Sequence, residues 1–213
     1  MAPKAGTPKN WPSQIPYLSV PSYSATLPRE ARSSLLVRSR EARDIPSEIA
    51  KGPSSTVHIK PISSPAHPAC GQSGLFTNKA LKPGDFVIQY LGVYHTTTSR
   101  PDDPHAKSDY DLSLDREMGI GIDADQMGNE ARFINDYRGV AQRPNAEFKE
   151  IWDPKRKEKG IAVWVLGAGK SGNNGFKGIK KGEEILVSYG KGFWGARAGA
   201  EIDAEAAAEE VNA

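Results

Sequence analysis

Short apolar runs in the middle of the chain either alternate with polar residues or are apolar throughout, and both patterns predict β-strands. Val57 and Ile59 alternate with polar neighbours, as do Tyr110, Leu112 and Leu114, which is the period of a half-buried strand. The runs 86–91 and 161–166 are apolar on both sides, as a strand covered on two faces requires. The run 185–189 is rich in β-forming residues. Because glycine or proline separates most of these runs, we expect a mostly β domain with long loops.

Helical signals are weaker than strand signals. Residues 29–50 contain good helix formers around a small apolar cluster, but Pro46 interrupts them, so they predict a short helix. One helical turn is expected at 129–134. Residues 1–28 hold six prolines among serines and threonines, a composition that disfavours helices and strand ladders alike and predicts a flexible or loosely docked arm. The chain is therefore divided into a proline-rich arm (1–55), a folded domain (56–197) and an acidic, alanine-rich tail (198–213).

Composition narrows the class of protein. The chain has 213 residues, 38% of them apolar, which is enough for one domain of ordinary size with its own core. Its formal net charge is +2, from 28 basic and 26 acidic residues, so the whole chain carries no strong footprint for nucleic acid, and no direct nucleic-acid contact is required. A single cysteine, Cys70, excludes an internal disulfide framework. The lack of a long apolar run or an apolar leader predicts an intracellular protein without membrane contact.

The four histidines are interpreted as ordinary surface residues. His58 and His67 flank proline-rich stretches, which is typical of solvated loops. His95 and His105 lie beside or within the polar segment 96–109, which we expect to be a surface loop. Because these histidines are scattered and only one cysteine accompanies them, the sequence predicts no metal site.

Three segments could carry chemistry, and each also has an ordinary structural explanation. Residues 71–76 contain two glycines three positions apart, which let a ligand approach the backbone but also occur in tight turns. Residues 128–137 place an amide and a carboxylate behind an apolar pair, as a capped helical turn also would. Residues 179–190 end in Tyr189 and a glycine, which can hold a phenol at the mouth of a site, although most such tyrosines are core or rim residues.

Taken together and in this order, these segments resemble the SET domain of protein-lysine methyltransferases, over roughly 57–197. The glycine-rich turn is similar to the family's cofactor-binding motif, and the strand at 86–92 ends in the family's Tyr-x-Gly pattern. Residues 128–136 are similar to the family signature that ends in Arg-Phe-Ile-Asn-His, with its Pro-Asn downstream at 144–145. Residues 182–190 are similar to the closing Gly-Glu-Glu-Leu…Tyr-Gly motif. Each match is modest alone, and the four in this order are specific.

The resemblance implies a mostly β (α+β) fold, a SET-type β-clip assembly of small sheets with short helices and flexible tails. In it, the segment after Arg132 and the final tyrosine strand form a C-terminal pseudoknot. It also implies methyl transfer from S-adenosylmethionine to the side-chain amine of a protein lysine, with the cofactor and the substrate on opposite faces joined by a narrow channel. The partner is then a protein with a target lysine, a histone tail being the class that the family suggests. The same analogy implies a nuclear location, with the cytoplasm as the other option.

The same resemblance assigns residues to the site. Tyr189 is expected to act in the chemistry, with Tyr110 as the second tyrosine on the channel. Tyrosines suit such a channel because ring faces stabilise cations and phenol oxygens accept hydrogen bonds from an ammonium group. The residues expected to contact the cofactor are Gly71, Ser73, Gly74, Leu75, Phe76, Arg132, Phe133, Asn135, Asp136 and Trp194.

The chain departs from the family pattern in two ways. Asp136 stands where the family motif has histidine, so a carboxylate replaces the interactions of that histidine. The cysteine cluster that many relatives carry after the closing tyrosine is absent, so no zinc is expected there. A non-catalytic SET-like module that binds a protein partner is therefore the alternative function. A phosphate-binding enzyme is disfavoured: residues 169–171 look like the end of a P-loop, but Trp164 stands where that pattern needs glycine.

Overall fold

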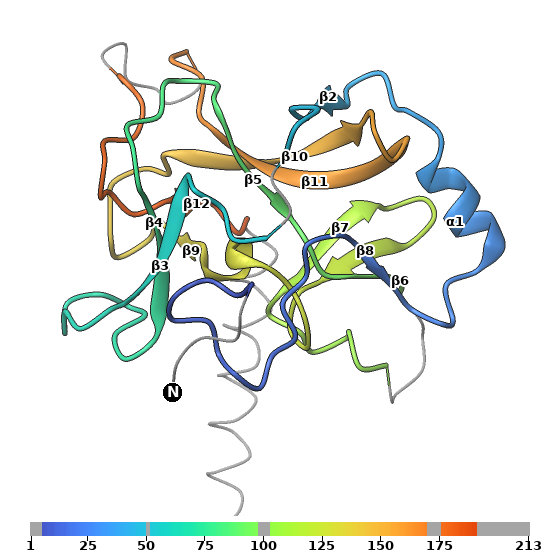
Figure 1. Ribbon diagram of the computed structural model, residues 1–213, viewed down its shortest axis with the longest axis horizontal. Helices are drawn as coiled ribbons and strands as arrows, with labels where there is room; N and C mark the ends of the chain where they lie inside the picture. Colours follow the sequence, from blue (N-terminus) through green and yellow to red (C-terminus); the bar gives the residue numbers. More distant parts are fainter. Residues whose placement is uncertain (1–5, 50–51, 98–102, 170–175, 191–213) are drawn as a thin grey trace, which may run out of the picture.

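Short strands account for most of the regular elements in the computed structural model of the chain (Figure 1). Within the described residues, helix is confined to α1 (Arg29–Leu35) and to the single 3-10 turn η1 (Glu130–Phe133). Both were expected from the sequence, and the mostly β fold class is confirmed. Trp194, the acidic tail and residues 170–175 lie outside the described part of the chain. The structure describes residues 6–49, 52–97, 103–169 and 176–190.

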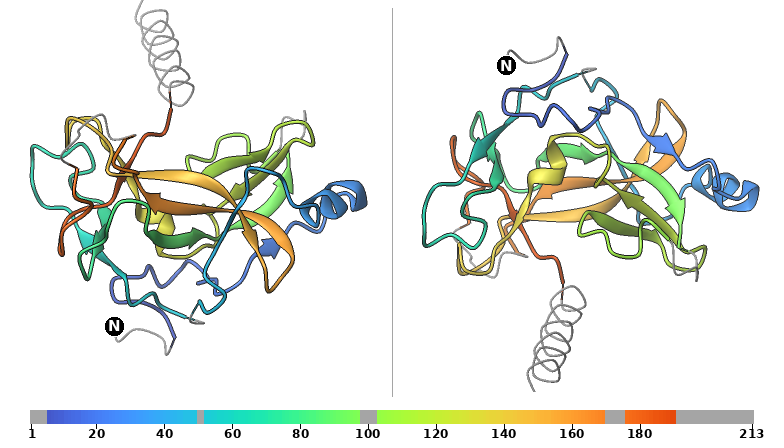
Figure 2. Two further views of the ribbon diagram at one scale, coloured as in Figure 1. Left: turned by 90° about the horizontal axis from the view of Figure 1, so that it is seen from above. Right: turned by 90° about the horizontal axis from the view of Figure 1, so that it is seen from below.

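The described strands form four small sheets. The first has the order β1-β6-β8-β7, at Ser22–Tyr23, Val93–Thr96, Ile120–Asp123 and Asp111–Asp115. The second has the order β2-β10-β11-β5, at Arg43–Asp44, Ala146–Asp153, Glu158–Val165 and Phe86–Tyr90. The two pairs are β3 with β4, at Val57–Pro61 and Ser73–Thr77, and β9 with β12, at Asn135–Asp136 and Leu186–Val187. In Figure 2 the β3–β4 pair lies at one end and the β6–β8–β7 sheet toward the other, with β10 and β11 between them.

The β10–β11 hairpin is the centre of the second sheet. Its strands pair without interruption from Ala146 opposite Val165 to Asp153 opposite Glu158. Seven of the eight residues of β11 are buried, because β5 pairs with its other edge. This confirms the apolar run 161–166 as a core strand. Strand β10 was not predicted, since charged residues occupy the centre of its sequence.

The last strand returns to the segment that follows η1. Strands β9 and β12 pair in parallel, with Leu186 opposite Asn135 and Val187 opposite Asp136. Asn145 fixes this arrangement, because its side chain donates to the carbonyl of Glu184 at 2.7 Å and accepts from the amide of Leu186 at 2.8 Å. The two distant motifs of the sequence therefore meet, as the expected pseudoknot requires.

The proline-rich arm makes strand contacts, which corrects the expectation that proline would exclude it from ladders. Strand β1 pairs in parallel with β6, and Tyr17 forms an isolated bridge with Gly128. Prolines flank these short stretches instead of interrupting them, so each pairing amide is still available. Trp11 packs edge-on against Phe133, with ring centroids 5.7 Å apart. The arm thus lies against the back of η1, which carries candidate site residues.

Candidate active site

A cavity of about 460 Å³ lies beside β9 and η1, and we call it the first cavity. Its walls come from the loop before β4, the segment before β7, the η1–β9 corner, the loop after β9 and Tyr189, which lies two residues after β12. Its size is within the usual range for small-molecule sites, roughly 300–1,000 Å³. The lining residues are His67, Pro68, Ala69, Gln72, Ser73, Asp109, Tyr110, Arg132, Phe133, Asn135, Asp136, Arg138, Val140 and Tyr189.

The structure brings most of the predicted site residues to this cavity. Those that line it are Ser73, Tyr110, Arg132, Phe133, Asn135, Asp136 and Tyr189. Those that do not line it are Gly71, Gly74, Leu75 and Phe76. Leu75 is completely buried in the core and accepts the amide hydrogen of Ile185, so its side chain has a packing role. Trp194 lies outside the described residues.

Gly74 shapes the site from behind the cavity wall. A Cβ atom at this position would lie 2.5 Å from Glu184 Oε1, so the Glu184 side chain would have to shift, and 3.2 Å from Asn135 Nδ2, which is a tight contact. Glycine therefore lets these two side chains approach the β4 backbone as they do here. Gly74 thus makes room for side chains that line or support the site, and its contact with the cofactor stays a prediction.

Asn135 belongs to a hydrogen-bonded group that the sequence did not reveal. Its Nδ2 donates to Glu184 Oε1 at 2.9 Å, and His67 Nε2 lies 3.1 Å from the other oxygen of Glu184. The His67 side chain is only 10% exposed, which corrects its interpretation as a solvated loop residue. Because its NH₂ group is held in this way, Asn135 is fixed with its carbonyl oxygen as the group left to act as an acceptor. That oxygen has no hydrogen-bond partner among the described residues.

Asp136 takes over a structural role at the position where the family motif has histidine. Its side chain is 5% exposed and accepts from the backbone amides of Arg138 at 2.9 Å and of Tyr189 at 2.7 Å. The Arg138 guanidinium lies 2.8 Å from Oδ2. The carboxylate thus connects the loop after β9 and Tyr189, which lies two residues after β12, to strand β9. Hydrogen bonds to an ionised group are stronger than neutral ones, so this junction is firmly held.

Tyr189 is held at both ends. Its amide donates to Asp136, and its hydroxyl donates to the carbonyl of Ile134 at 2.6 Å. Because the hydroxyl proton is committed to that carbonyl, the phenol oxygen can act toward a ligand only as an acceptor. The described geometry therefore favours a positioning and charge-stabilising role for Tyr189 over that of a proton donor.

A second cavity, of about 410 Å³, adjoins the first on the side of β7 and β11. It is lined by Tyr90, Asp109, Tyr110, Asp111, Leu112, Ser113, Arg116, Ala131, Arg132, Ile134, Phe148, Ile161, Ser188 and Tyr189. The residues common to both cavities are Asp109, Tyr110, Arg132 and Tyr189. The two tyrosines expected on a channel thus form part of a wall between two cavities.

The shared wall is rigid on the side of Tyr110. Arg132 lies 4.2 Å above the Tyr110 ring and donates through Nε to the carbonyl of Ala124 at 2.9 Å. Tyr90 donates its hydroxyl to the Tyr110 carbonyl at 2.6 Å. Burial and then the nearby charge of Asp123 raise the pKa of Tyr90 well above its usual value, so this phenol keeps its proton and the hydrogen bond.

The small sheets and the two adjoining cavities define a β domain built around a tyrosine-bearing wall. A family model described as SET domain matches residues 72–190, which is more than half of the chain. The chain therefore belongs to the SET-domain family. The match begins at the loop before β4 and ends at the glycine after Tyr189, so it contains every residue of the shared wall.

Similar solved structures belong to polycomb repressive complex 2. One, from Chaetomium thermophilum, is in an autoinhibited conformation bound to S-adenosylmethionine; it is 29% identical with a TM-score of 0.46. A humanized mutant of the Chaetomium thermophilum complex bound to an inhibitor is 28% identical with a TM-score of 0.47. A crystal structure of an active complex in the basal state is 30% identical with a TM-score of 0.48. Each match covers 63% of this chain and 15% of the other chain.

Two further observations concern the described residues alone. They contain no helix that is long and apolar enough to cross a membrane. They also contain no group of three or more histidine, cysteine, aspartate or glutamate side chains placed to hold a metal ion.

Proposed function

We propose that the chain transfers a methyl group from S-adenosylmethionine to the side-chain amine of a protein lysine. The observation that supports this most directly is the wall shared by the two cavities, where Tyr110 and Tyr189 stand together. A methyl donor in one cavity and an amine entering through the other could meet at this wall. Membership of the SET-domain family gives the same reaction class.

The groups around the first cavity fit a charged, partly aromatic ligand of this kind. Asn135 offers a fixed carbonyl oxygen to an ammonium group. Phe133, Tyr110 and Tyr189 contribute aromatic side chains to the lining, and aromatic rings suit an aromatic base and a positive sulfonium. Arg138 and Asp136 add both signs of charge at one end. When bound, S-adenosylmethionine would supply an activated methyl group.

The described residues would act mainly by alignment. Holding two reactants in register can lower a barrier by roughly 7–11 kcal/mol, so groups that fix orientation are worth more than a strong base here. Tyr189 would accept a hydrogen bond from the substrate amine, because its own proton is committed to Ile134. Burial of the amine between tyrosine rings, together with the nearby positive charge of the donor, favours loss of its proton.

We further propose a protein partner that presents its lysine to the second cavity. Asp109 and Asp111 line this cavity beside Arg116, so it offers acidic groups to an approaching ammonium group. A histone tail is the substrate class that the family suggests, and a nuclear location would follow from it. Methyl-transfer assays on candidate proteins test the substrate class, and imaging of the protein in cells tests its location.

Binding of S-adenosylmethionine is the first test of the proposal. A ligand that binds only the folded state raises the melting temperature, so saturating S-adenosylmethionine should shift the thermal transition upward. Methyl transfer from labelled cofactor to a panel of histones and other proteins then measures activity. The absence of both a shift and a binding isotherm at millimolar cofactor would refute the proposal.

Tyr189→Phe tests the assigned residue, with Tyr137→Phe as its matched control. Tyr137 loses the same hydroxyl but lines neither cavity. If Tyr189→Phe removes one hydrogen bond worth about 1.4 kcal/mol, we expect the rate of methyl transfer to fall about tenfold. The affinity for the cofactor should change little. Equal activity of Tyr189→Phe and the control would remove Tyr189 from the mechanism.

The alternative is a SET-like module that binds a protein partner without transferring a methyl group. One observation favours it: a carboxylate, Asp136, replaces histidine at a residue that lines the first cavity. The histidine could serve a ligand there, whereas both carboxylate oxygens bond to protein donors. Asp136→His separates the two functions. If S-adenosylmethionine binds only to this variant, the natural chain is a binding module.

A further inference from the structure

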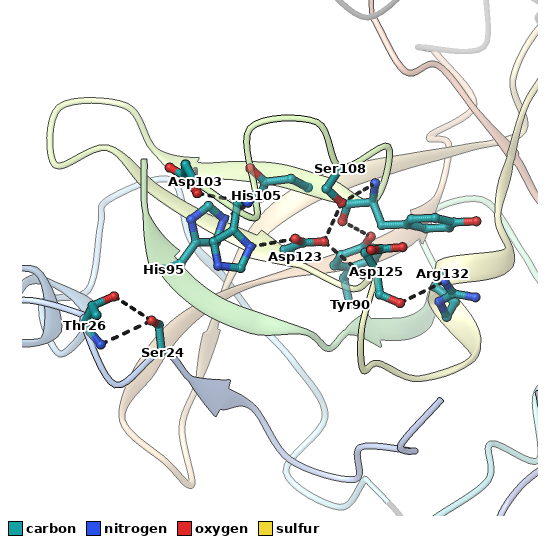
Figure 3. Close-up of polar contacts among 12 residues, drawn as sticks. Ser24, Thr26, Tyr90, His95, Asp103, His105, Ser108, Asp123, Asp125 and Arg132 are labelled. Atoms are coloured by element: carbon teal, nitrogen blue, oxygen red, sulfur yellow. Dashed lines mark hydrogen bonds and ion pairs between the residues drawn. The ribbon is translucent and has the colours of Figure 1, made fainter. Parts of the chain in front are cut away.

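Two histidines and two aspartates form a paired cluster between the first sheet and the loop that joins β6 to β7. Figure 3 shows His95, His105 and Asp123 of this cluster, with Ser108 beside them. The rings of His95 and His105 are stacked, with centroids 3.7 Å apart and planes inclined by 17°. His95 Nε2 lies 2.9 Å from Asp111 Oδ1, and His105 Nδ1 lies 2.7 Å from Asp123 Oδ2. His95 and Asp123 are 2% and 4% exposed. His95 is therefore a buried residue of β6, which corrects its interpretation as a loop residue.

The cluster is connected to the backbone of Tyr110 through Ser108. The Ser108 hydroxyl donates to Asp123 Oδ1 at 2.7 Å and accepts from the amide of Tyr110 at 3.1 Å. On its other side, the Tyr110 carbonyl accepts from Tyr90 Oη at 2.6 Å and from the amide of Ala124 at 3.1 Å. Both polar groups of the Tyr110 backbone are therefore held by this network.

Gly121 in β8 leaves space for the His95–Asp111 pair of this cluster. A Cβ atom at Gly121, inside β8, would lie 2.5 Å from Asp111 Oδ1 and 2.7 Å from His95 Nε2. Only a residue without a side chain allows these two groups to pair across the strand. Burial lowers the pKa of His95, but the hydrogen bond and charge of Asp111 outweigh burial, and the net pKa is raised.

We propose that Ser108, clamped by Asp123 and the stacked histidines, is the positioning residue that sets Tyr110 in the wall between the two cavities. This inference rests on the proposed methyl transfer and assigns part of its geometry to groups outside both cavities. Neither Ser108, Asp123 nor the two histidines lines either cavity. They act through Tyr110.

Holding Tyr110 in place matters because the rate of a reaction that depends on alignment is sensitive to small displacements of the positioning groups. A shift of about 1 Å in a positioning group can lower a rate by roughly a hundredfold. The segment 103–109 between β6 and β7 is a loop, and in the described residues its histidine and serine attach it to Asp123. Without these two contacts, the position of Tyr110 would depend on the hydrogen bonds of its carbonyl with Tyr90 and Ala124 and on the Arg132 guanidinium over its ring.

The charges that face the histidine pair come from three elements. Asp111 belongs to β7 and Asp123 to β8, and Asp103 in the loop accepts the amide hydrogen of His105 at 2.9 Å. Two carboxylates thus pair with the two imidazoles, with Asp103 beside the His105 backbone, and protonation of a ring strengthens its ion pair. The clamp should therefore be tighter at mildly acidic pH than at alkaline pH.

Ser108→Ala, with Ser108→Thr as the conservative partner, tests the clamp. Alanine removes the link to both Asp123 and Tyr110, whereas threonine keeps the hydroxyl. The first readout is amide hydrogen exchange at Tyr110, measured by NMR on the full chain without cofactor or substrate. Loss of one hydrogen bond predicts exchange about tenfold faster in Ser108→Ala and close to the natural rate in Ser108→Thr.

The second readout separates turnover from binding in the same variants. We expect kcat to fall about tenfold in Ser108→Ala, with KM for S-adenosylmethionine nearly unchanged, and threonine to restore most of the activity. His58→Asn, which removes a histidine outside the cluster, is the control and should leave kcat unchanged.

Unchanged exchange at the Tyr110 amide in Ser108→Ala would show that Ser108 does not hold Tyr110, whether or not the chain is an enzyme. Faster exchange with unchanged kcat overturns only its role in methyl transfer. If the natural chain transfers no methyl group, the proposed function fails, and the exchange measurement still decides the clamp.

Discussion

Replacing Asp136 by asparagine removes a negative charge from the candidate site and keeps the shape of the side chain. The two carboxylate oxygens accept from the backbone amides of Tyr189 at 2.7 Å and of Arg138 at 2.9 Å. An asparagine amide has one acceptor oxygen, so in either orientation its NH₂ group faces one of these N–H groups. One donor therefore loses its partner at a side chain that is 5% exposed.

We expect Asp136→Asn to lower the free energy of unfolding by about 2 kcal/mol. A hydrogen bond to a charged group contributes about 1.5–3 kcal/mol and a neutral one about 1 kcal/mol, and an unsatisfied buried donor costs about 1–3 kcal/mol. The ion pair with Arg138 adds little to this sum, because the Arg138 side chain is 37% exposed and water screens the charge.

Urea denaturation at pH 7, followed by tryptophan fluorescence, measures this loss as a lower midpoint at an unchanged slope. The matched control is Asp125→Asn, which removes the same charge from an exposed side chain and should change stability by less than about 0.5 kcal/mol. If Asp136→Asn is no less stable than the control, the carboxylate does not hold the junction, and the argument from its hydrogen bonds is wrong.

Three further changes have expected outcomes. Gly74→Ala should destabilise the fold by about 1–3 kcal/mol in urea and weaken cofactor binding, because the new methyl group displaces Glu184; normal stability would contradict the close approach. Gly121→Ala should cost a similar amount by the same measurement, since its methyl group would collide with the His95–Asp111 pair. In Asp111→Asn the loss of stability should be larger at pH 6 than at pH 9. The raised pKa of His95 makes its ion pair fully stabilising below the unfolded value of about 6.5, and this contribution is lost as pH rises through the folded value. A loss independent of pH would show that His95 is neutral.

Local sequence signals predicted the core strands well. The strands with apolar alternation or continuous apolar runs, β3, β5, β7 and β11, were all expected. Strand β10 was not, because Lys149 and Glu150 interrupt its apolar pattern, and burial comes from its pairing with β11. Strand β8 was hidden by Gly121, whose small size serves the packing of distant side chains and does not mark a turn.

The candidate site was predicted in its motifs and missed in its supporting contacts. Asn135 and Tyr189 were assigned from short motifs, and both line the first cavity. His67 and Glu184 were not recognised as partners, since 117 residues separate them in the chain. A histidine beside prolines carries no local sign of such a contact. The same holds for His95, whose side chain bonds to Asp111 on β7 and stacks on His105 in a loop.

The side chain at residue 136 supports the junction between β9 and the residues after β12. The junction needs an acceptor for the amide of Tyr189, because the parallel pairing of β9 and β12 ends at Val187 and leaves the next amides without a ladder partner. A carboxylate supplies that acceptor directly, and it brings a charge that must be balanced, which Arg138 does from the same turn. The position of Tyr189 therefore depends on the acceptor that the side chain at 136 offers to its amide, together with the hydrogen bond of its hydroxyl to Ile134. The chemistry of the cavity, in contrast, depends on what the side chain at 136 offers to a ligand. Stability and cofactor affinity should for this reason respond differently to Asp136→His, and measuring both in one variant separates the structural role of this residue from its role in binding.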